Sequence, residues 1–169
     1  MSSPTRRTVV LGLGNPIMGD DGLGLAALAR LKEGWELPPS LELVDGGTWG
    51  MNLLPMIEDA DELLLLDAIR SGAAPGTVHE MSRGELPRYL AHKLSPHQID
   101  LKEVLALAEL RGTLPPVVAA VGAEPDRVEM SAILTPELEA VVDAVAEKAA
   151  HRLEAWGHHV KKRPAYSHA

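Results

Sequence analysis

Several segments of the chain show the apolar patterns that are typical of β-strands. They are residues 8–11, 41–45, 63–68, 77–81 and 116–122. Residues 41–45 alternate between apolar and polar side chains, whereas residues 63–66 form a continuous leucine run, as expected for a central parallel strand covered on both faces. The shorter pattern at 77–81 predicts an edge strand that is antiparallel to its neighbour.

Apolar residues at helical spacing lie between these strands. The predicted helices cover residues 23–33, 48–57, 96–108 and 135–157. Thr48 is the expected cap of the second helix, and Ser95 followed by Pro96 is a typical start for the third. Residues 82–96 lack a regular pattern and predict a long loop, which in a compact domain often carries function.

Strands that alternate with helices predict an α/β three-layer sandwich. We expect a mostly parallel, twisted sheet of about five strands, with helices on both faces and right-handed connections. Residues 1–157 are predicted to form a single catalytic domain, and residues 158–169 a polar, flexible tail.

Composition excludes several kinds of chemistry. The 169 residues include no cysteine, which excludes disulfides, thiol nucleophiles and cysteine-ligated metal sites. A formal net charge of −8 opposes general affinity for nucleic acid or anionic lipid. No segment approaches the ~20 apolar residues of a membrane span. We therefore expect a soluble, cytoplasmic protein that has neither nucleic acid nor membrane as a partner.

Acidic residues follow three of the predicted strands. Asp20 and Asp21 follow the first, Asp45 ends the second and Asp67 ends the third. Ligands of open α/β sheets bind beyond the carboxyl ends of the strands, where parallel strands would gather these acids. The helix that starts near His97 can bring an imidazole to the same edge.

Asp21, Asp67 and His97 together would suit a borderline divalent metal such as nickel, zinc or manganese. The structural alternative is that strand-end acids cap helices and that a histidine at a helix start serves packing. The sequence leaves open whether Asp20 or Asp21 faces the site.

The glycine-rich segment 12–24 invites two other interpretations. Gly12 and Gly14 follow a strand as in dinucleotide-binding loops, but Ile17 stands where the third glycine belongs, and the two acids would repel a pyrophosphate. Residues 12–16 also resemble the opening of peptidyl-tRNA hydrolase. That family's Thr-Arg-His-Asn continuation is absent, and the acidic charge disfavours a tRNA partner. The sequence shows neither a nucleophile elbow with its triad nor a His-Glu-x-x-His motif.

A longer series of motifs resembles the hydrogenase maturation proteases in order and spacing, over about residues 8–155. The matching segments are Gly12-x-Gly14-Asn15, Asp20-Asp21-Gly22-x-Gly24, Asp45-Gly46-Gly47-Thr48-x-Gly50, Leu66-Asp67-Ala68, Lys93-x-Ser95-Pro96-His97-Gln98, Val121-Gly122-Ala123-Glu124-Pro125 and Leu134-Thr135-Pro136. The resemblance implies an endopeptidase that removes the C-terminal extension from the large-subunit precursor of a nickel-iron hydrogenase.

The resemblance also implies roles for individual residues. Asp21, Asp67 and His97 match the family's metal-contacting positions, and the nickel would arrive bound to the substrate rather than as a tightly held cofactor. Other divalent metals can occupy such a site. The substrate groove is expected to include Asp45, Gly46, Gly47 and Lys93. For Asp45, the structural alternative is that it simply ends a strand.

A function of another class stays open at this stage. A nickel-responsive binding module or chaperone would recognise the same precursor without cutting it. Release of a C-terminal peptide from nickel-loaded precursor distinguishes the two.

Overall fold

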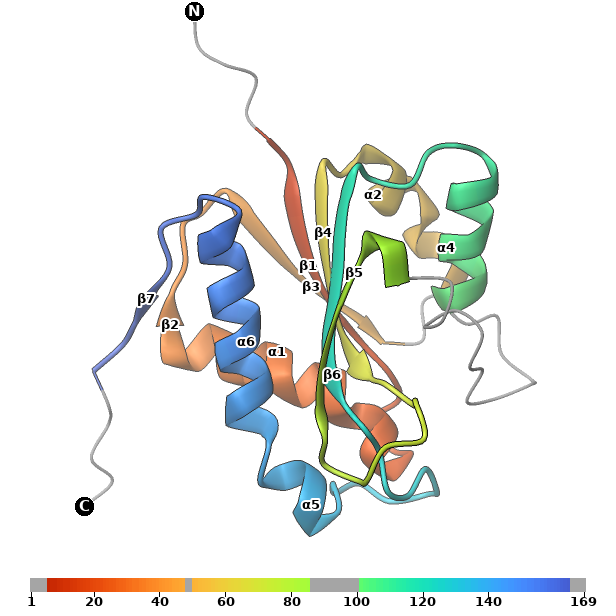
Figure 1. Ribbon diagram of the computed structural model, residues 1–169, viewed down its shortest axis with the longest axis vertical. Coiled ribbons are helices and arrows are strands. Elements are labelled where there is room, and N and C mark those ends of the chain that lie inside the picture. The colour runs from red at the N-terminus through yellow and green to blue at the C-terminus, as the bar shows by residue number, and fades with distance from the viewer. Residues whose placement is uncertain (1–5, 48–49, 86–100, 165–169) are drawn as a thin grey trace, which may run out of the picture.

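A computed structural model describes residues 6–47, 50–85 and 101–164. Its centre is a five-stranded sheet with the strand order β3-β1-β4-β6-β5. The strands are β1 (Thr8–Leu13), β3 (Leu41–Gly47), β4 (Glu62–Ala68), β5 (Val78–Ser82) and β6 (Val117–Ala123). All neighbours pair in parallel except β5, which is antiparallel to β6 at the edge (Figure 1). The predicted strands and the antiparallel edge are confirmed.

Helices cover both faces of the sheet, which confirms the three-layer prediction (Figure 1). One face carries α1 (Leu23–Gly34) and α6 (Val142–Ala155), and the other carries α2 (Leu54–Asp59) and α4 (Leu101–Leu110). Shorter elements are η1 (Gly19–Gly22), η2 (Gly50–Leu53), η3 (Arg83–Glu85) and α5 (Pro136–Glu139). No helix within the described ranges has the length and apolar character needed to cross a membrane.

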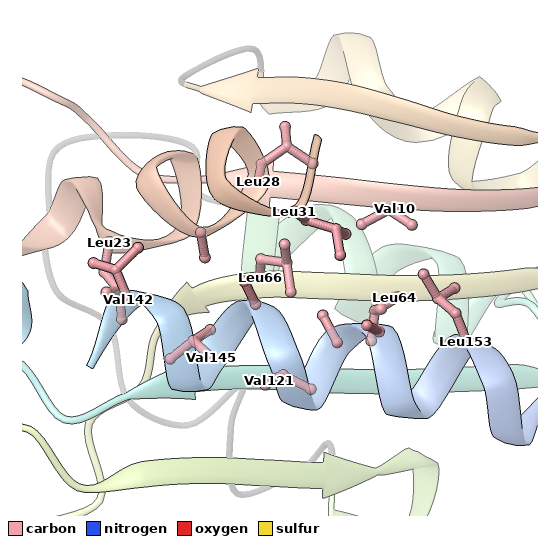
Figure 2. Close-up of a cluster of buried hydrophobic side chains, with 14 of the residues drawn as sticks. Val10, Leu23, Leu28, Leu31, Leu64, Leu66, Val121, Val142, Val145 and Leu153 are labelled. Carbon is pink, nitrogen blue, oxygen red and sulfur yellow. The ribbon is translucent and has the colours of Figure 1, made fainter. Parts of the chain in front are cut away.

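The leucine run of β4 explains why this strand lies at the centre. Leu64 and Leu66 pack with α1 and α6, as Figure 2 shows, whereas Leu63 and Leu65 pack with α2 and α4. All four side chains are fully buried. Because successive side chains of a strand point to opposite faces, a strand covered on both sides needs an unbroken apolar run.

Two predicted helices are divided in the structure. The segment predicted at 48–57 is a 3-10 turn, η2, followed by α2, and Pro55 stands in the first turn of α2, where a missing N–H costs nothing. Thr48, the expected cap, lies outside the described residues. The last helix is interrupted between α5 and α6, where Val141 N donates to Leu138 O over 3.1 Å, a tighter connection than the α-helical one.

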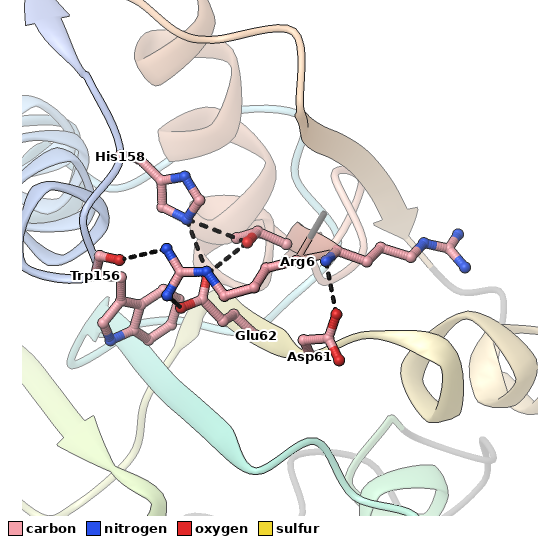
Figure 3. Close-up of polar contacts among 7 residues, drawn as sticks. Arg6, Asp61, Glu62, Trp156 and His158 are labelled. Carbon is pink, nitrogen blue, oxygen red and sulfur yellow. Dashed lines mark hydrogen bonds and ion pairs between the residues drawn. The ribbon is translucent and has the colours of Figure 1, made fainter. Parts of the chain in front are cut away.

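The chain beyond α6 departs from the predicted polar tail. His158 Nε2 lies 2.8 Å from Glu62 Oε1, in a cluster that Arg6 joins through a 3.1 Å bond to Glu62 Oε2 (Figure 3). Val160 is buried, and β7 (Lys161–Lys162) pairs with β2 (Trp35–Glu36) in an antiparallel ladder. The polar composition of residues 158–164 gives no sign of this order, because the segment is held by a partly buried histidine–carboxylate contact and by main-chain pairing of two short strands.

Candidate functional site

The candidate site lies at the carboxyl ends of the parallel strands, where the acids meet. Gly24, in the first turn of α1, allows this helix to begin close to the ends of the strands. A Cβ atom there would lie 2.1 Å from the main-chain oxygen of Leu66 and 2.6 Å from that of Leu13. Only glycine therefore lets α1 begin so close to the ends of β1 and β4. As a result η1, which carries Asp21, contacts β4.

Asp21 is half-buried in the loop that follows β1. Its Oδ2 accepts a 2.8 Å hydrogen bond from Asn15 N, and its own N donates to Met18 O over 3.2 Å. The turn depends on Gly14, which has a φ of +112° and whose Cβ, if present, would lie 1.8 Å from the main-chain oxygen of Asp21. Because Gly14 has no side chain, the loop can pack closely against the main chain of Asp21, the residue that carries the carboxylate.

Asp67 stands near the end of β4 and is only 7% exposed. Its Oδ1 accepts a 2.9 Å hydrogen bond from Ala68 N. Because β1 and β4 are paired neighbours, the loop after β1 and the end of β4 bring Asp21 and Asp67 to the same edge. Their carboxylate oxygens are the type of ligand that hard and borderline divalent metals accept.

Asp20 has a different role from Asp21. It is fully buried, and it joins the glycine loop to the segment after β6. Its Oδ2 accepts from Asp126 N (2.9 Å), Arg127 N (3.0 Å) and Thr135 Oγ1 (2.8 Å), while its Oδ1 accepts from Thr135 N (2.7 Å). Both carboxylate oxygens of Asp20 thus accept hydrogen bonds from the protein, which makes Asp21 the candidate ligand of this pair.

The electrostatics of Asp20 reflect these contacts. Burial alone would raise the pKa of its carboxyl, but the hydrogen bonds from Thr135, Arg127 and Asp126 outweigh burial and hold the pKa below its ordinary value. Asp20 is therefore a charged residue with a structural role, and we call its four hydrogen bonds to residues 126, 127 and 135 the Asp20 clasp. Sequence reasoning did not identify this role, because the partners lie more than 100 residues away.

A Ser–His–Glu cluster at the end of β6 was not predicted from the sequence either. Glu124 is 3% exposed, and its Oε2 lies 3.0 Å from His79 Nε2 and 3.1 Å from Ser71 Oγ. The Ser71 hydroxyl in turn lies 3.2 Å from the same His79 nitrogen. A catalytic triad needs the acid and the hydroxyl on opposite ring nitrogens, so this arrangement is not a triad.

The cluster is instead a second structural clasp. Glu124 also accepts from the main-chain N–H groups of Ser71 and Gly72 over 2.9–3.1 Å. Burial would raise the pKa of Glu124, but the bonds from His79, Ser71 and Gly72 lower it overall. The loop after β4 is thereby fixed to the end of β6.

The remaining predicted site residues divide into two groups. Asp45 is exposed near the end of β3, and buried Gly46 packs closely on the side chains of β1. Lys93 and His97 lie outside the described residues, so their part in the site stays a prediction. Within the described ranges, no three histidine or acidic side chains are grouped as they would be to hold a metal ion.

The known proteins that are similar to this chain are proteins of hydrogenase maturation. A sequence profile described as hydrogenase maturation protease matches residues 25–152. The hydrogenase expression/formation protein HupD of Rhodobacter capsulatus is 36% identical over 158 residues, which cover 92% of this chain and 75% of the relative. The hydrogenase 2 maturation protease of Escherichia coli (strain K12) is 36% identical over 143 residues, which cover 84% of this chain and 87% of the relative.

The structural similarity extends over almost the whole chain. The hydrogenase maturating endopeptidase HybD from E. coli superposes with a TM-score of 0.85 at 34% sequence identity. The match covers 93% of this chain and 98% of that chain. The mixed sheet and its flanking helices are therefore those of an endopeptidase of known structure.

Proposed function

The chain belongs to the hydrogenase maturation protease family and is therefore a peptidase, and we propose that it removes the C-terminal extension of a nickel-iron hydrogenase large-subunit precursor after nickel insertion. One observation carries the proposal. Asp21, in the loop that follows β1, and Asp67, near the end of the neighbouring parallel strand β4, lie at the carboxyl ends of the strands, where such sheets bind ligands.

Nickel enters this proposal as part of the substrate. The carboxylates of Asp21 and Asp67, with the imidazole of His97 as the predicted third ligand, contact the metal that the precursor already holds. Three protein ligands leave coordination positions for the precursor's own ligands. An extension next to the bound nickel is thus held beside these residues.

The chain's own groups have separate tasks in this scheme. Asp21, half-buried and held by Asn15 N, offers one carboxylate in a fixed orientation. Asp67, held by Ala68 N, offers the second. Exposed Asp45 and half-buried Gly47 line the path of the extension, with Lys93 as a predicted further contact, whereas Gly46 is buried against β1. Either polarisation of the scissile carbonyl by the substrate's nickel or a carboxylate acting as the base for water would promote the hydrolysis.

The experiment compares nickel-loaded with nickel-free precursor. We expect mass spectrometry to detect a released C-terminal peptide only with the loaded form. Asp67→Asn should lower the rate of release by at least 100-fold, an effect on the order of losing one transition-state contact. Glu109→Gln, which changes an exposed acid near the end of α4 and away from the carboxyl ends of the strands, is the control and should process normally.

Two results would contradict the proposal. Binding of the loaded precursor without release of a peptide would favour the chaperone function. Full activity of the combined Asp67→Asn and His97→Ala variant would remove these residues from the site while leaving the peptidase function intact.

A further inference from the structure

Exposed apolar side chains gather beyond the carboxyl ends of the parallel strands, where the acids lie. Among the described residues, the large hydrophobic side chains that are exposed are Ile17, Met51, Leu110, Val117, Met130 and Ile133. Ile17 follows β1, Met51 follows β3, and Met130 and Ile133 follow β6, all beyond carboxyl ends. The other two lie toward the opposite end, since Val117 begins β6 and Leu110 ends α4.

Ile17, Met130 and Ile133 form what we call the apolar rim, and they are 57%, 84% and 77% exposed. Their loops are joined by main-chain hydrogen bonds. Ser131 N donates to Ile17 O over 3.0 Å, and Gly19 N donates to Ser131 O over 2.9 Å. The two loops therefore form one continuous surface.

The Asp20 clasp fixes this surface in place. Its four hydrogen bonds hold both ends of the segment that carries Met130 and Ile133, at residues 126–127 and at Thr135. The segment is therefore held at both ends, and Met130 and Ile133 are exposed on it. A contiguous exposed apolar patch that is bordered by polar residues is typical of a protein–protein interaction site.

The apolar rim is continuous with the candidate site. Met18, between Ile17 and the clasp, accepts the hydrogen bond from Asp21 N and pairs with Ser131. Charged side chains surround the rim, since Asp126, Arg127 and Glu129 are exposed on the same loop. An apolar centre with a polar border is the usual composition of a protein–protein interface.

We propose that the apolar rim is a docking surface for the hydrogenase large-subunit precursor, which it binds through an apolar patch beside the nickel. This inference rests on the proposed function, because the rim adjoins Asp21 and the occupant must be the protein that presents nickel there. A second copy of this chain on the rim would obstruct the approach to Asp21. The rim contributes affinity for the precursor whether or not nickel is bound.

The test separates docking from metal recognition. The variants are Ile17→Ser and the double variant Met130→Ser with Ile133→Ser, and the control is Leu110→Ser, which removes a side chain that is also 84% exposed. We expect the double variant to lose about tenfold in affinity for nickel-free precursor, as removal of interface anchors does. Processing of loaded precursor should show a KM raised by a similar factor and a nearly unchanged kcat. Leu110→Ser should match the wild type.

The outcomes are distinguishable. If the rim variants bind both forms of the precursor as tightly as the wild type, the docking surface is refuted, whatever the peptidase assay shows. If the wild type releases no peptide but its affinity still depends on the rim, the proposed function fails and the docking surface stands. If sedimentation shows a wild-type dimer that the rim variants lose while precursor affinity is unchanged, the rim is a self-association surface and the proposal is overturned.

Discussion

Replacing Asp20 by asparagine should destabilise the protein far more than its similar size implies. Three donors, from Asp126, Arg127 and Thr135, point at Oδ2 and a fourth points at Oδ1. The amide group of asparagine would place N–H groups against at least one of these donors, whichever way it is turned. The substitution also removes the charge that strengthens every bond of the clasp.

The magnitude follows from the number of bonds. A hydrogen bond to a charged group contributes about 1.5–3 kcal/mol, and bonds that share one carboxylate do not add fully. We expect Asp20→Asn to lower the free energy of unfolding by about 3–5 kcal/mol, which corresponds to a fall in Tm of roughly 10 °C for a chain of this size. Asp126→Asn changes an exposed carboxylate and should stay within about 0.5 kcal/mol of the wild type.

The assay is urea unfolding followed by circular dichroism at several pH values. The pKa of Asp20 is lower in the folded than in the unfolded state, so the unfolded state binds more protons and acid destabilises the protein. The gap between wild type and Asp20→Asn should be complete above about pH 5, and it should close as pH falls below about 4 and through the folded pKa. A gap smaller than about 1 kcal/mol at pH 7, or one that persists unchanged in acid, would refute the clasp.

Two further predictions concern other close contacts. Gly24→Ala should abolish folding or displace α1, because the added methyl group would collide with main-chain oxygens of β1 and β4. The control Gly34→Ala adds a methyl group that meets no atom within 4 Å, so it should be tolerated. Soluble yield and Tm compare the two variants, and equal values would contradict the packing argument. Glu124→Gln should cost about 2 kcal/mol at pH 7, in line with loss of charge-assisted bonds. Because the folded pKa of Glu124 is lowered, this cost should also disappear in acid, and a cost that is independent of pH would show that charge is not its source.

The strands could be predicted because their patterns are local. The leucine run marks β4 as a strand covered on both faces, and the short apolar pattern at 77–81 marks the antiparallel edge strand. Both features depend on residues a few positions apart. The same locality makes the glycine loop recognisable as a turn that presents acids.

Contacts between distant segments could not be predicted in this way. The choice between Asp20 and Asp21 depends on donors at residues 126, 127 and 135, and the order of His158 depends on Glu62. Nothing in the spacing of two adjacent aspartates says which one turns inward. The metal-binding role of Asp21 and Asp67 with His97 stays a prediction, which the nickel-dependent cleavage assay tests.

The contact between Arg6 and Trp156 joins the segment before β1 to the end of α6. The guanidinium of Arg6 donates to the Trp156 carbonyl over 2.9 Å, and both His158 and Arg6 reach Glu62 at the start of β4. Asp67 lies five residues further along the strand, about 17 Å away at ~3.3 Å per residue. The segment before β1 and the segment after α6 are therefore held together at the amino end of β4, the end of the sheet opposite the acids.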